Sequence, residues 1–533
     1  MDKAVMLVMV LSGCSAGQTP TESKARAVSE GLGNTTLTRL DTPWVEGVTL
    51  LMTQFPDAVV VDEAVRGAVG VDLDPLVDDR EGFRTRLLDD AGRELWARTT
   101  PTPVLVRDYL QRYSELAGVD LLAFFADLGA FHVRVPLLPG GATAVFEIRD
   151  EDGVFREMGT FNMTRVPTNP PAPPDNVTGW TTLHEGGPSE AALDLTLVGD
   201  GYTEADQDKW QSDAAALADA LLSRPPLSRF SGRINVHRLD ALSVESGASY
   251  DCVGECRVRD TAFRSFFALN FVNDLLGTDY RDGPIFQLGQ HDLNRALSVV
   301  PTDLAIVLVN TELRGGMSIH HASVATGGDD WIDTGVHEAG HLIGLLGDEY
   351  IGDECIRSES MGLPRNIAAD PTDPPWPQWI DVTTPLPTPS TNDNDQVVGA
   401  FETAFNCEDL YRPTLQCRMR GGVDTPFCPV CSEQLVLQLT RHADIVWPEL
   451  ALAEDGAWLY LNTLGLDAQV RVSEDAVSWT EVTSPIWVPA DSADLWVEVA
   501  LETPLVRVVD PMMVETLHFG WRDRSTDQDG VVE

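Results

Sequence analysis

The spacing of apolar residues predicts mainly β-strands in the first third of the chain. Apolar and polar residues alternate over 131–135 and 145–149, and the second run continues through Asp152-Gly153 into another apolar pair, as in a β-hairpin. One helix is predicted at about 103–128. We therefore expect a β-rich, sandwich-like domain over residues 41–166.

A proline-rich stretch beginning at Pro167 follows this domain. Proline fixes φ and lacks a backbone donor, so it continues neither a helix nor a central strand. We expect a linker over residues 167–190.

The middle of the chain has the pattern of an α/β (α+β) domain, which we place at residues 191–445. The run at 304–309 is apolar on both faces, which is typical of a central strand. Further strands are predicted at 193–198 and 234–239, and helices at 203–222 and 333–346.

Beyond Trp447 the pattern returns to short alternating runs such as 495–499. These predict a small C-terminal β domain over residues 446–524. Residues 525–533 have the composition of a solvated tail.

Composition and charge exclude two classes of protein. With 533 residues, 43% of them hydrophobic, the chain is long and apolar enough for several folded domains, so a chain disordered throughout is excluded. Its 37 Lys and Arg against 83 Asp and Glu give a net charge of −46, which repels phosphate backbones. We therefore expect no nucleic-acid partner.

The first residues predict export. Lys3 precedes an apolar run over residues 4–11, and Ser12-Gly13-Cys14 follows, so residues 1–13 are typical of a signal peptide. Residues 11–14 resemble a bacterial lipobox, which makes Cys14 the expected lipidation site; ordinary signal cleavage is the alternative. The run is shorter than the ~20 residues that span a bilayer. We expect a flexible tether over residues 14–40, and a protein anchored to the cell envelope through this lipid alone, or secreted.

The chemistry is concentrated in a His-Glu-x-x-His motif within the helix predicted at 333–346. His337 and His341 are four residues apart, so on a helix they lie on one face and can bind one Zn²⁺ ion. Glu338 lies beside them, where a carboxylate can act as general base toward water activated by the metal. Asp333 or Thr334 is the expected N-cap of this helix.

A catalytic zinc site has three protein ligands and one open position. The chain offers Asp348, seven residues after His341, because a turn through Gly344 and Gly347 can return a carboxylate to the metal. Asp348 is the favoured third ligand, and Glu349 is the alternative.

Several motifs together resemble one known family, the IgA-peptidase zinc metallopeptidases, metallopeptidase family sixty-four, which is related to the metzincins. Residues 198–203 look like the opening strand and turn of the family. The similarity covers residues 190–440 and includes the segments 245–247, 411–413, 417–420 and 427–431.

The resemblance implies a metzincin-like fold with one catalytic Zn²⁺ bound by His337, His341 and Asp348, and with Glu338 as general base. It also implies that Met419 is the Met-turn residue. In the metzincins with three histidine ligands the third ligand comes six residues after the second, a place that Gly347 occupies here.

Seven cysteines between Cys252 and Cys431 predict disulfides in an oxidising compartment. Cys252 and Cys256 are a plausible local bridge. Cys428 and Cys431 form a Cys-x-x-Cys pair, which is also found in redox sites and zinc knuckles. Neither a thioredoxin-like context nor a second pair is evident, so we expect disulfides that involve Cys407, Cys417, Cys428 and Cys431 and hold the loop of Met419.

The sequence thus predicts a zinc metalloendopeptidase that hydrolyses a protein or peptide substrate. Two alternatives remain. The chain is a surface binding protein with a non-catalytic zinc site, or it is a zinc amidase that acts on a non-protein amide such as a cell-wall cross-link. An intact Glu338 favours an enzyme, because a purely structural zinc site needs no general base.

Overall fold

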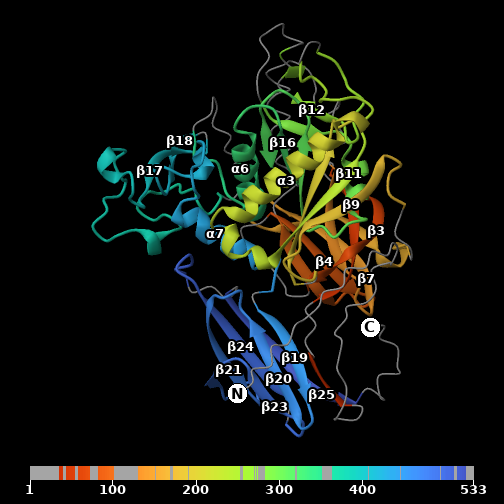
Figure 1. Ribbon diagram of the computed structural model, residues 1–533, viewed down its shortest axis with the longest axis vertical. Coiled ribbons are helices and arrows are strands. Elements are labelled where there is room, and N and C mark those ends of the chain that lie inside the picture. Colours follow the sequence, from red (N-terminus) through yellow and green to blue (C-terminus); the bar gives the residue numbers. More distant parts are fainter. Residues whose placement is uncertain are drawn as a thin grey trace, which may run out of the picture.

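The amino-terminal part of the chain folds into two antiparallel sheets that share one core in the computed structural model (Figure 1). One sheet has the order β3-β2-β6 and the other the order β5-β4-β7-β8. Phe83, Phe131 and Phe146 come from both sheets and pack together in this core. The strands are β2 (Trp44–Gln54), β3 (Val59–Asp72), β4 (Phe83–Asp89), β5 (Glu94–Thr100), β6 (Ala130–Pro136), β7 (Gly141–Arg149) and β8 (Phe155–Asn162).

The structure describes most of the chain, and several predictions lie outside the part described: the signal peptide at 1–13, Cys14, the helix at about 103–128 and the tail at 525–533. Among the described helices, none has the length and apolar character needed to cross a bilayer. The described residues are 35–39, 44–54, 58–72, 82–100, 130–150, 152–167, 172–189, 191–252, 256–268, 270–271, 273, 283–318, 321–350, 363–405, 407–444, 446–492, 494–508 and 513–523.

A six-stranded mixed sheet forms the centre of the molecule, in the order β15-β16-β14-β10-β11-β9. Four neighbouring strands are parallel, and the strand at each end runs antiparallel to its neighbour. The predicted central run is β14, which pairs with β10 on one side and β16 on the other. The strands are β9 (Val177–His184), β10 (Leu193–Asp200), β11 (Ile234–Ala241), β14 (Leu304–Val309), β15 (Gly316–Ser318) and β16 (Ala322–Ala325).

Helices cover both faces of this sheet because successive residues of a strand point to opposite sides. Leu195 and Leu197 of β10 share a core with α3 (Gln207–Ser223), α6 (Trp331–Gly344) and α7 (Pro429–Leu439). Val198 belongs to a second core with α5 (Gln290–Leu297) and the hairpin of β12 (Ser265–Phe267) and β13 (Ile285–Gln287). Figure 1 shows α3 and α6 side by side against the sheet.

Short elements connect these layers. The hairpin of β17 (Phe401–Ala404) and β18 (Cys407–Arg412) precedes the one-turn helix η8 (Arg418–Arg420). The remaining 3₁₀ helices are η2 (Met163–Arg165), η3 (Glu204–Asp206), η4 (Leu227–Arg229), η5 (Ser231–Arg233), η6 (Pro377–Trp379) and η7 (Asn392–Asn394).

The C-terminal part contains two antiparallel sheets, β1-β25-β24-β21-β22 and β19-β20-β23. Val488 of one sheet and Leu517 of the other are buried in the same core. The strands are β1 (Thr35–Arg39), β19 (Trp447–Ala453), β20 (Gly456–Asn462), β21 (Asp467–Ser473), β22 (Thr480–Val482), β23 (Ile486–Pro489), β24 (Leu495–Glu502) and β25 (Val514–Asp523).

Two strands lie where we expected none. β1 falls at the end of the tether predicted at 14–40, and it pairs with β25, so its backbone groups are satisfied by a partner far along the chain. β9 falls inside the linker predicted at 167–190 and pairs with β11. Each is held by backbone pairing with a strand from a later part of the chain.

Asp200, at the end of β10, organises the loops beside the sheet. Its carboxylate is fully buried and accepts hydrogen bonds from the backbone N–H groups of Phe263 (3.0 Å) and Ser265 (2.8 Å). It also accepts from the hydroxyl of Thr261 at 3.1 Å. Gly201 follows with φ of 74°, and a Cβ there would lie 2.1 Å from the carbonyl oxygen of Gly247. Close backbone packing and the positive φ thus require glycine at position 201.

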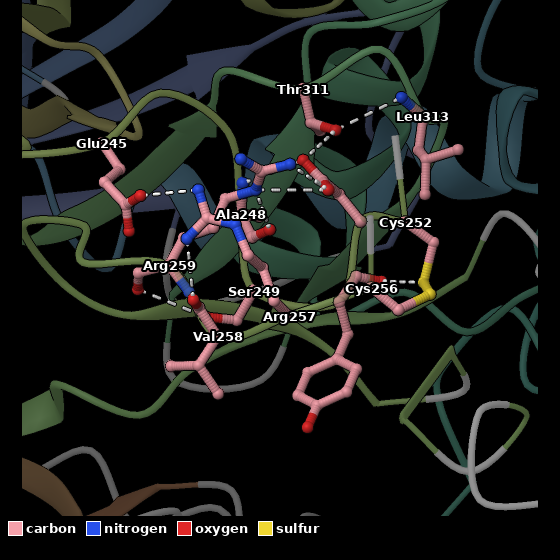
Figure 2. A network of polar contacts seen from close by, with 12 residues as sticks. Glu245, Ala248, Ser249, Cys252, Cys256, Arg257, Val258, Arg259, Thr311 and Leu313 are labelled. Carbon is pink, nitrogen blue, oxygen red and sulfur yellow. Dashed lines mark hydrogen bonds and ion pairs between the residues drawn. A yellow bond between two sulfur atoms is a disulfide. The ribbon is translucent and has the colours of Figure 1, made fainter. Parts of the chain in front are cut away.

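A network of ion pairs holds the loop after β11 (Figure 2). Arg257 contacts Glu245 at 2.6 Å, and Arg259 contacts Asp251 at 3.0 Å. Cys252 and Cys256 form a disulfide in the same loop, which confirms the predicted local bridge.

We predict that Asp200→Ala lowers the free energy of unfolding of the central domain by about 3 kcal/mol or more. The substitution leaves two buried backbone N–H groups without an acceptor, and each costs about 1–3 kcal/mol. The midpoint of thermal unfolding measures the effect. Asp219→Ala, at an exposed position of α3, is the control and should change stability by less than about 0.5 kcal/mol. Equal midpoints for the two variants would contradict the role of Asp200.

Candidate metal centre

Helix α6 presents His337 and His341 on one face, with their Nε2 atoms 3.1 Å apart. The helix begins at Trp331 with Asp330 as N-cap, so the predicted capping by Asp333 or Thr334 is wrong. Asp333 instead forms ion pairs with Arg224 (2.8 Å) and the buried Arg418 (2.7 Å), and the second pair joins α6 to η8.

The hydrogen bonds of the two rings determine which nitrogen is free. Nδ1 of His337 lies 2.9 Å from the carbonyl oxygen of Arg418, and Nδ1 of His341 lies 2.6 Å from that of Leu346. A carbonyl oxygen only accepts, so each Nδ1 carries the proton. Both Nε2 lone pairs therefore point toward the same place, which is the arrangement of metal-ligating histidines.

The chain turns back toward the histidines directly after α6. Leu345 adopts a left-handed conformation, and its N–H closes the helix on the carbonyl of His341 at 3.0 Å. Asp348 then lies with Oδ1 at 3.0 Å from Nε2 of His337 and 3.2 Å from Nε2 of His341. The structure thus brings Asp348 together with the two histidines.

Contacts from distant segments hold this turn in place. The side-chain amide of Asn366 accepts from the N–H of Gly347 and donates to its carbonyl, both at 2.8 Å. The carbonyl of Asp348 accepts from the N–H of Phe405 at 2.8 Å. The N–H of Glu349 donates to the carbonyl of Met419, also at 2.8 Å.

The three donor atoms fit a divalent metal ion. Two neutral imidazole nitrogens and a carboxylate oxygen are all acceptors, and acceptors at 3.0–3.2 Å repel each other unless a cation lies between them. These separations are close to the edge of about 3.3 Å in a tetrahedron with metal–ligand bonds of ~2.0–2.1 Å.

The electrostatics of the site also favour positive charge. Burial lowers the pKa of His341, but the charge of Asp348 and the hydrogen bond that a protonated His341 donates to its carboxylate raise this pKa to about 9. For Asp348, burial acts to raise the pKa, yet the charge of His341 and the hydrogen bonds from both histidines hold it well below its usual range.

Glu338 lies on the same helix and is only 6% exposed. Burial raises the pKa of its carboxyl group, and the charges of His341 and His337 oppose this only in part. Among the described residues and atoms, none is a hydrogen-bond partner of Oε2. The carboxyl group packs against Gly316 of β15, where a Cβ would lie 2.4 Å from Oε1.

Met419 lies in η8 and packs against α6 at Gly340. It is fully buried, and a Cβ on Gly340 would lie 2.6 Å from its Sδ atom. Gly340 lies between His337 and His341 in the sequence, and its lack of a side chain lets Met419 approach the helix. The role of Met419 as a Met-turn residue stays a prediction from the family resemblance.

The predicted disulfides around this loop are wrong for three of the four cysteines. Cys417, Cys428 and Cys431 are free and buried, and the sulfur atoms of Cys417 and Cys431 are 3.6 Å apart, whereas a disulfide bond is ~2.05 Å. Cys407 does take part in a disulfide.

Comparison with known protein families gives one match. Residues 181–397 match the sequence model of a family described as IgA Peptidase M64. This segment belongs to the M64 peptidase family. No curated protein matches the chain. M64 peptidases are metallopeptidases, and the M64 segment includes His337, Glu338, His341 and Asp348. The predicted family resemblance is therefore confirmed.

Two residues near the candidate metal centre were not predicted from the sequence. Asn366 holds the turn that carries Asp348, but it lies in a stretch without periodic pattern. The ring of Tyr350 is stacked 6.2 Å from that of His337. Partial burial and the charges of Asp348 and Glu338 raise the pKa of Tyr350 well above its usual value, so its hydroxyl keeps its proton. Its position directly after Asp348 and Glu349 was the available signal.

We predict that Asp348→Ala removes one equivalent of metal per chain relative to the parent protein. The remaining two histidines provide too few donors to retain the ion through dialysis, since such a site uses three protein ligands. Inductively coupled plasma mass spectrometry measures the metal content. Asp329→Ala, which changes an exposed carboxylate just before α6, should leave the content unchanged. Equal metal contents would exclude Asp348 as a ligand.

Proposed function

We propose that the chain is a zinc-dependent endopeptidase with a metzincin-like catalytic domain, in which Glu338 is the general base. The observation that carries this proposal is the buried Glu338 carboxylate, whose Oε2 has no partner among the described residues, beside a His337, His341 and Asp348 donor set. The M64 match supports a metallopeptidase.

The number of donors supports a catalytic rather than a structural role. Structural zinc normally has four protein ligands, whereas catalytic zinc has three and an open position. His337, His341 and Asp348 would hold the ion. When bound, Zn²⁺ supplies a Lewis acid that polarises the scissile carbonyl and lowers the pKa of water to about 7.

Glu338 performs the proton transfers in this proposal. Burial raises the pKa of Glu338 toward neutral pH. A carboxylate whose pKa lies nearer the working pH both accepts and returns a proton efficiently. It takes a proton from the attacking water and delivers it to the leaving amine. Tyr350 keeps its hydroxyl proton and lies near His337, so it donates a hydrogen bond to the negative charge that develops on the carbonyl oxygen.

The substrate lies next to β15 in this proposal. β15 is the last strand of the central sheet, and its Gly316 contacts Glu338. An extended peptide adjacent to this strand would place a backbone carbonyl near the general base.

We also propose that the protein is exported and anchored through a lipid on Cys14. The sequence of residues 11–14 supports lipidation. The Cys252–Cys256 disulfide is consistent with an oxidising compartment.

We predict that Glu338→Gln retains the parent's metal content but lowers kcat by about 10²- to 10⁴-fold, because an amide cannot accept the proton. Cleavage of a diverse peptide library, analysed by mass spectrometry, gives the rate. Glu204→Gln, at an exposed carboxylate, is the control and should cleave like the parent. Parent-like cleavage by Glu338→Gln would refute the mechanism.

We further predict that Gly316→Ala lowers kcat by at least about tenfold with the metal content preserved. The added Cβ occupies the space of the Glu338 carboxylate and displaces it, and small displacements of a catalytic group are costly. Gly187→Ala serves as control, because a Cβ there meets its nearest neighbour at an ordinary 3.6 Å. If both variants cleave at the parent rate, the contact with Gly316 does not position Glu338.

A further inference from the structure

A second cluster of metal-ligating side chains lies next to the candidate metal centre. It consists of Glu349, Cys417, Cys428 and Cys431, whose ligand atoms all lie within 4.8 Å of one another. All four residues are at most 4% exposed. The sulfur of Cys431 lies 3.6 Å from that of Cys417 and 3.1 Å from Oε1 of Glu349.

These separations suit a shared ion better than a disulfide. A tetrahedral zinc site with Zn–S bonds of ~2.3 Å has sulfur atoms about 3.8 Å apart, whereas a disulfide requires ~2.05 Å. Elsewhere in the structure Cys252 and Cys256 do form a disulfide, whereas these three cysteines are free. Three thiols also leave one unpaired in any disulfide arrangement.

The carboxylate of Glu349 is suited to bind a cation. Its Oε1 accepts from the side-chain amide of Asn366 at 3.1 Å, but its fully buried Oε2 has no hydrogen-bond partner among the described groups. Burying an ionised carboxylate is unfavourable unless it is paired or binds a metal. A metal ion between Glu349 and the sulfur atoms satisfies this requirement.

The backbone around the cysteines is arranged to stabilise thiolates. Cys428 is the N-cap of α7, and its sulfur accepts from the N–H of Cys431 at 3.5 Å. The sulfur of Cys417 accepts from the N–H of Cys428 at 3.4 Å. Helix N-termini and N–H donors favour the thiolate form, which is the form that binds metals.

A positive charge lies near the cluster. Arg412 is 3% exposed, and burial lowers its pKa to about 10 while the charge of Glu349 acts in the opposite direction. Three thiolates and one carboxylate carry four negative charges, of which a divalent ion neutralises two. Arg412 offsets part of the remainder.

We propose that Glu349, Cys417, Cys428 and Cys431 bind a second, structural Zn²⁺ ion. Three soft thiolates and a carboxylate in a closed, four-donor site are typical of structural zinc. The ion would join the residue after Asp348, the loop of Met419 and the start of α7. It thus holds together the segments that shape the first metal centre, without contacting the substrate.

Metal content in a protein without the first centre tests this site. We expect two zinc ions in the parent, one in the purified His337→Ala/His341→Ala variant, and none when Cys428→Ser is added to that variant. Cys252→Ser/Cys256→Ser, which removes two cysteines outside the cluster, is the control and should retain two. If the double-histidine variant retains no zinc, or if Cys428→Ser leaves its content unchanged, the proposal is wrong.

A second measurement avoids any effect of Cys428→Ser on folding. We expect the double-histidine variant, with all cysteines intact, to bind one Co²⁺ and to show thiolate-to-cobalt charge-transfer absorption in the near ultraviolet. Absence of this absorption would overturn the proposal. So would peptide mapping that finds two of the three cysteines joined by a disulfide in the parent.

Discussion

The candidate metal centre depends on the reversal of the chain directly after helix α6. The left-handed residue Leu345 ends the helix, and the next residues run back along it until Asp348 meets both histidines. A left-handed leucine is unfavourable in isolation, so surrounding contacts must maintain it. Those contacts come from Asn366, Phe405 and Met419, each in a different later segment. The position of the third donor is therefore a property of the whole domain.

The same reversal separates two neighbouring carboxylates into two environments. Asp348 faces histidine nitrogens, whereas Glu349 faces cysteine sulfurs, and their backbone groups bond to the hairpin of β17 and β18 and to η8. The carbonyl of Arg418 in η8 also orients His337. One short segment and one helical turn thus connect the chemistry of both clusters, so displacement of either affects both.

The sequence predicted the parts of the site that depend on local geometry. His337, Glu338 and His341 lie within one helical turn, and a helix alone brings the two histidines together. Asp348 and Glu349 stayed alternatives for the third ligand. The path of this turn depends on contacts with distant residues, so the residues of the turn alone do not predict it. The fate of Cys417, Cys428 and Cys431 was predicted wrongly, since their spacing suits paired sulfurs and a shared ion equally well.

The fold shows the same division. The apolar run at 304–309 identified the central strand β14, because a strand that is buried on both faces is apolar at successive positions. The strands β1 and β9 have no such run of apolar residues. Each lies at the edge of a sheet, where backbone hydrogen bonds to one partner strand hold it.

The pairing of β1 with β25 has a consequence for the order of folding. Thr35 is opposite Asp523, so this contact closes a loop of nearly the entire chain. During synthesis β1 emerges well before its partner β25, and long-range strand pairing is slow because the two strands must first meet. Until then the edge of β25 has no neighbour. The sheet therefore assembles only after the domains between these two strands have been made.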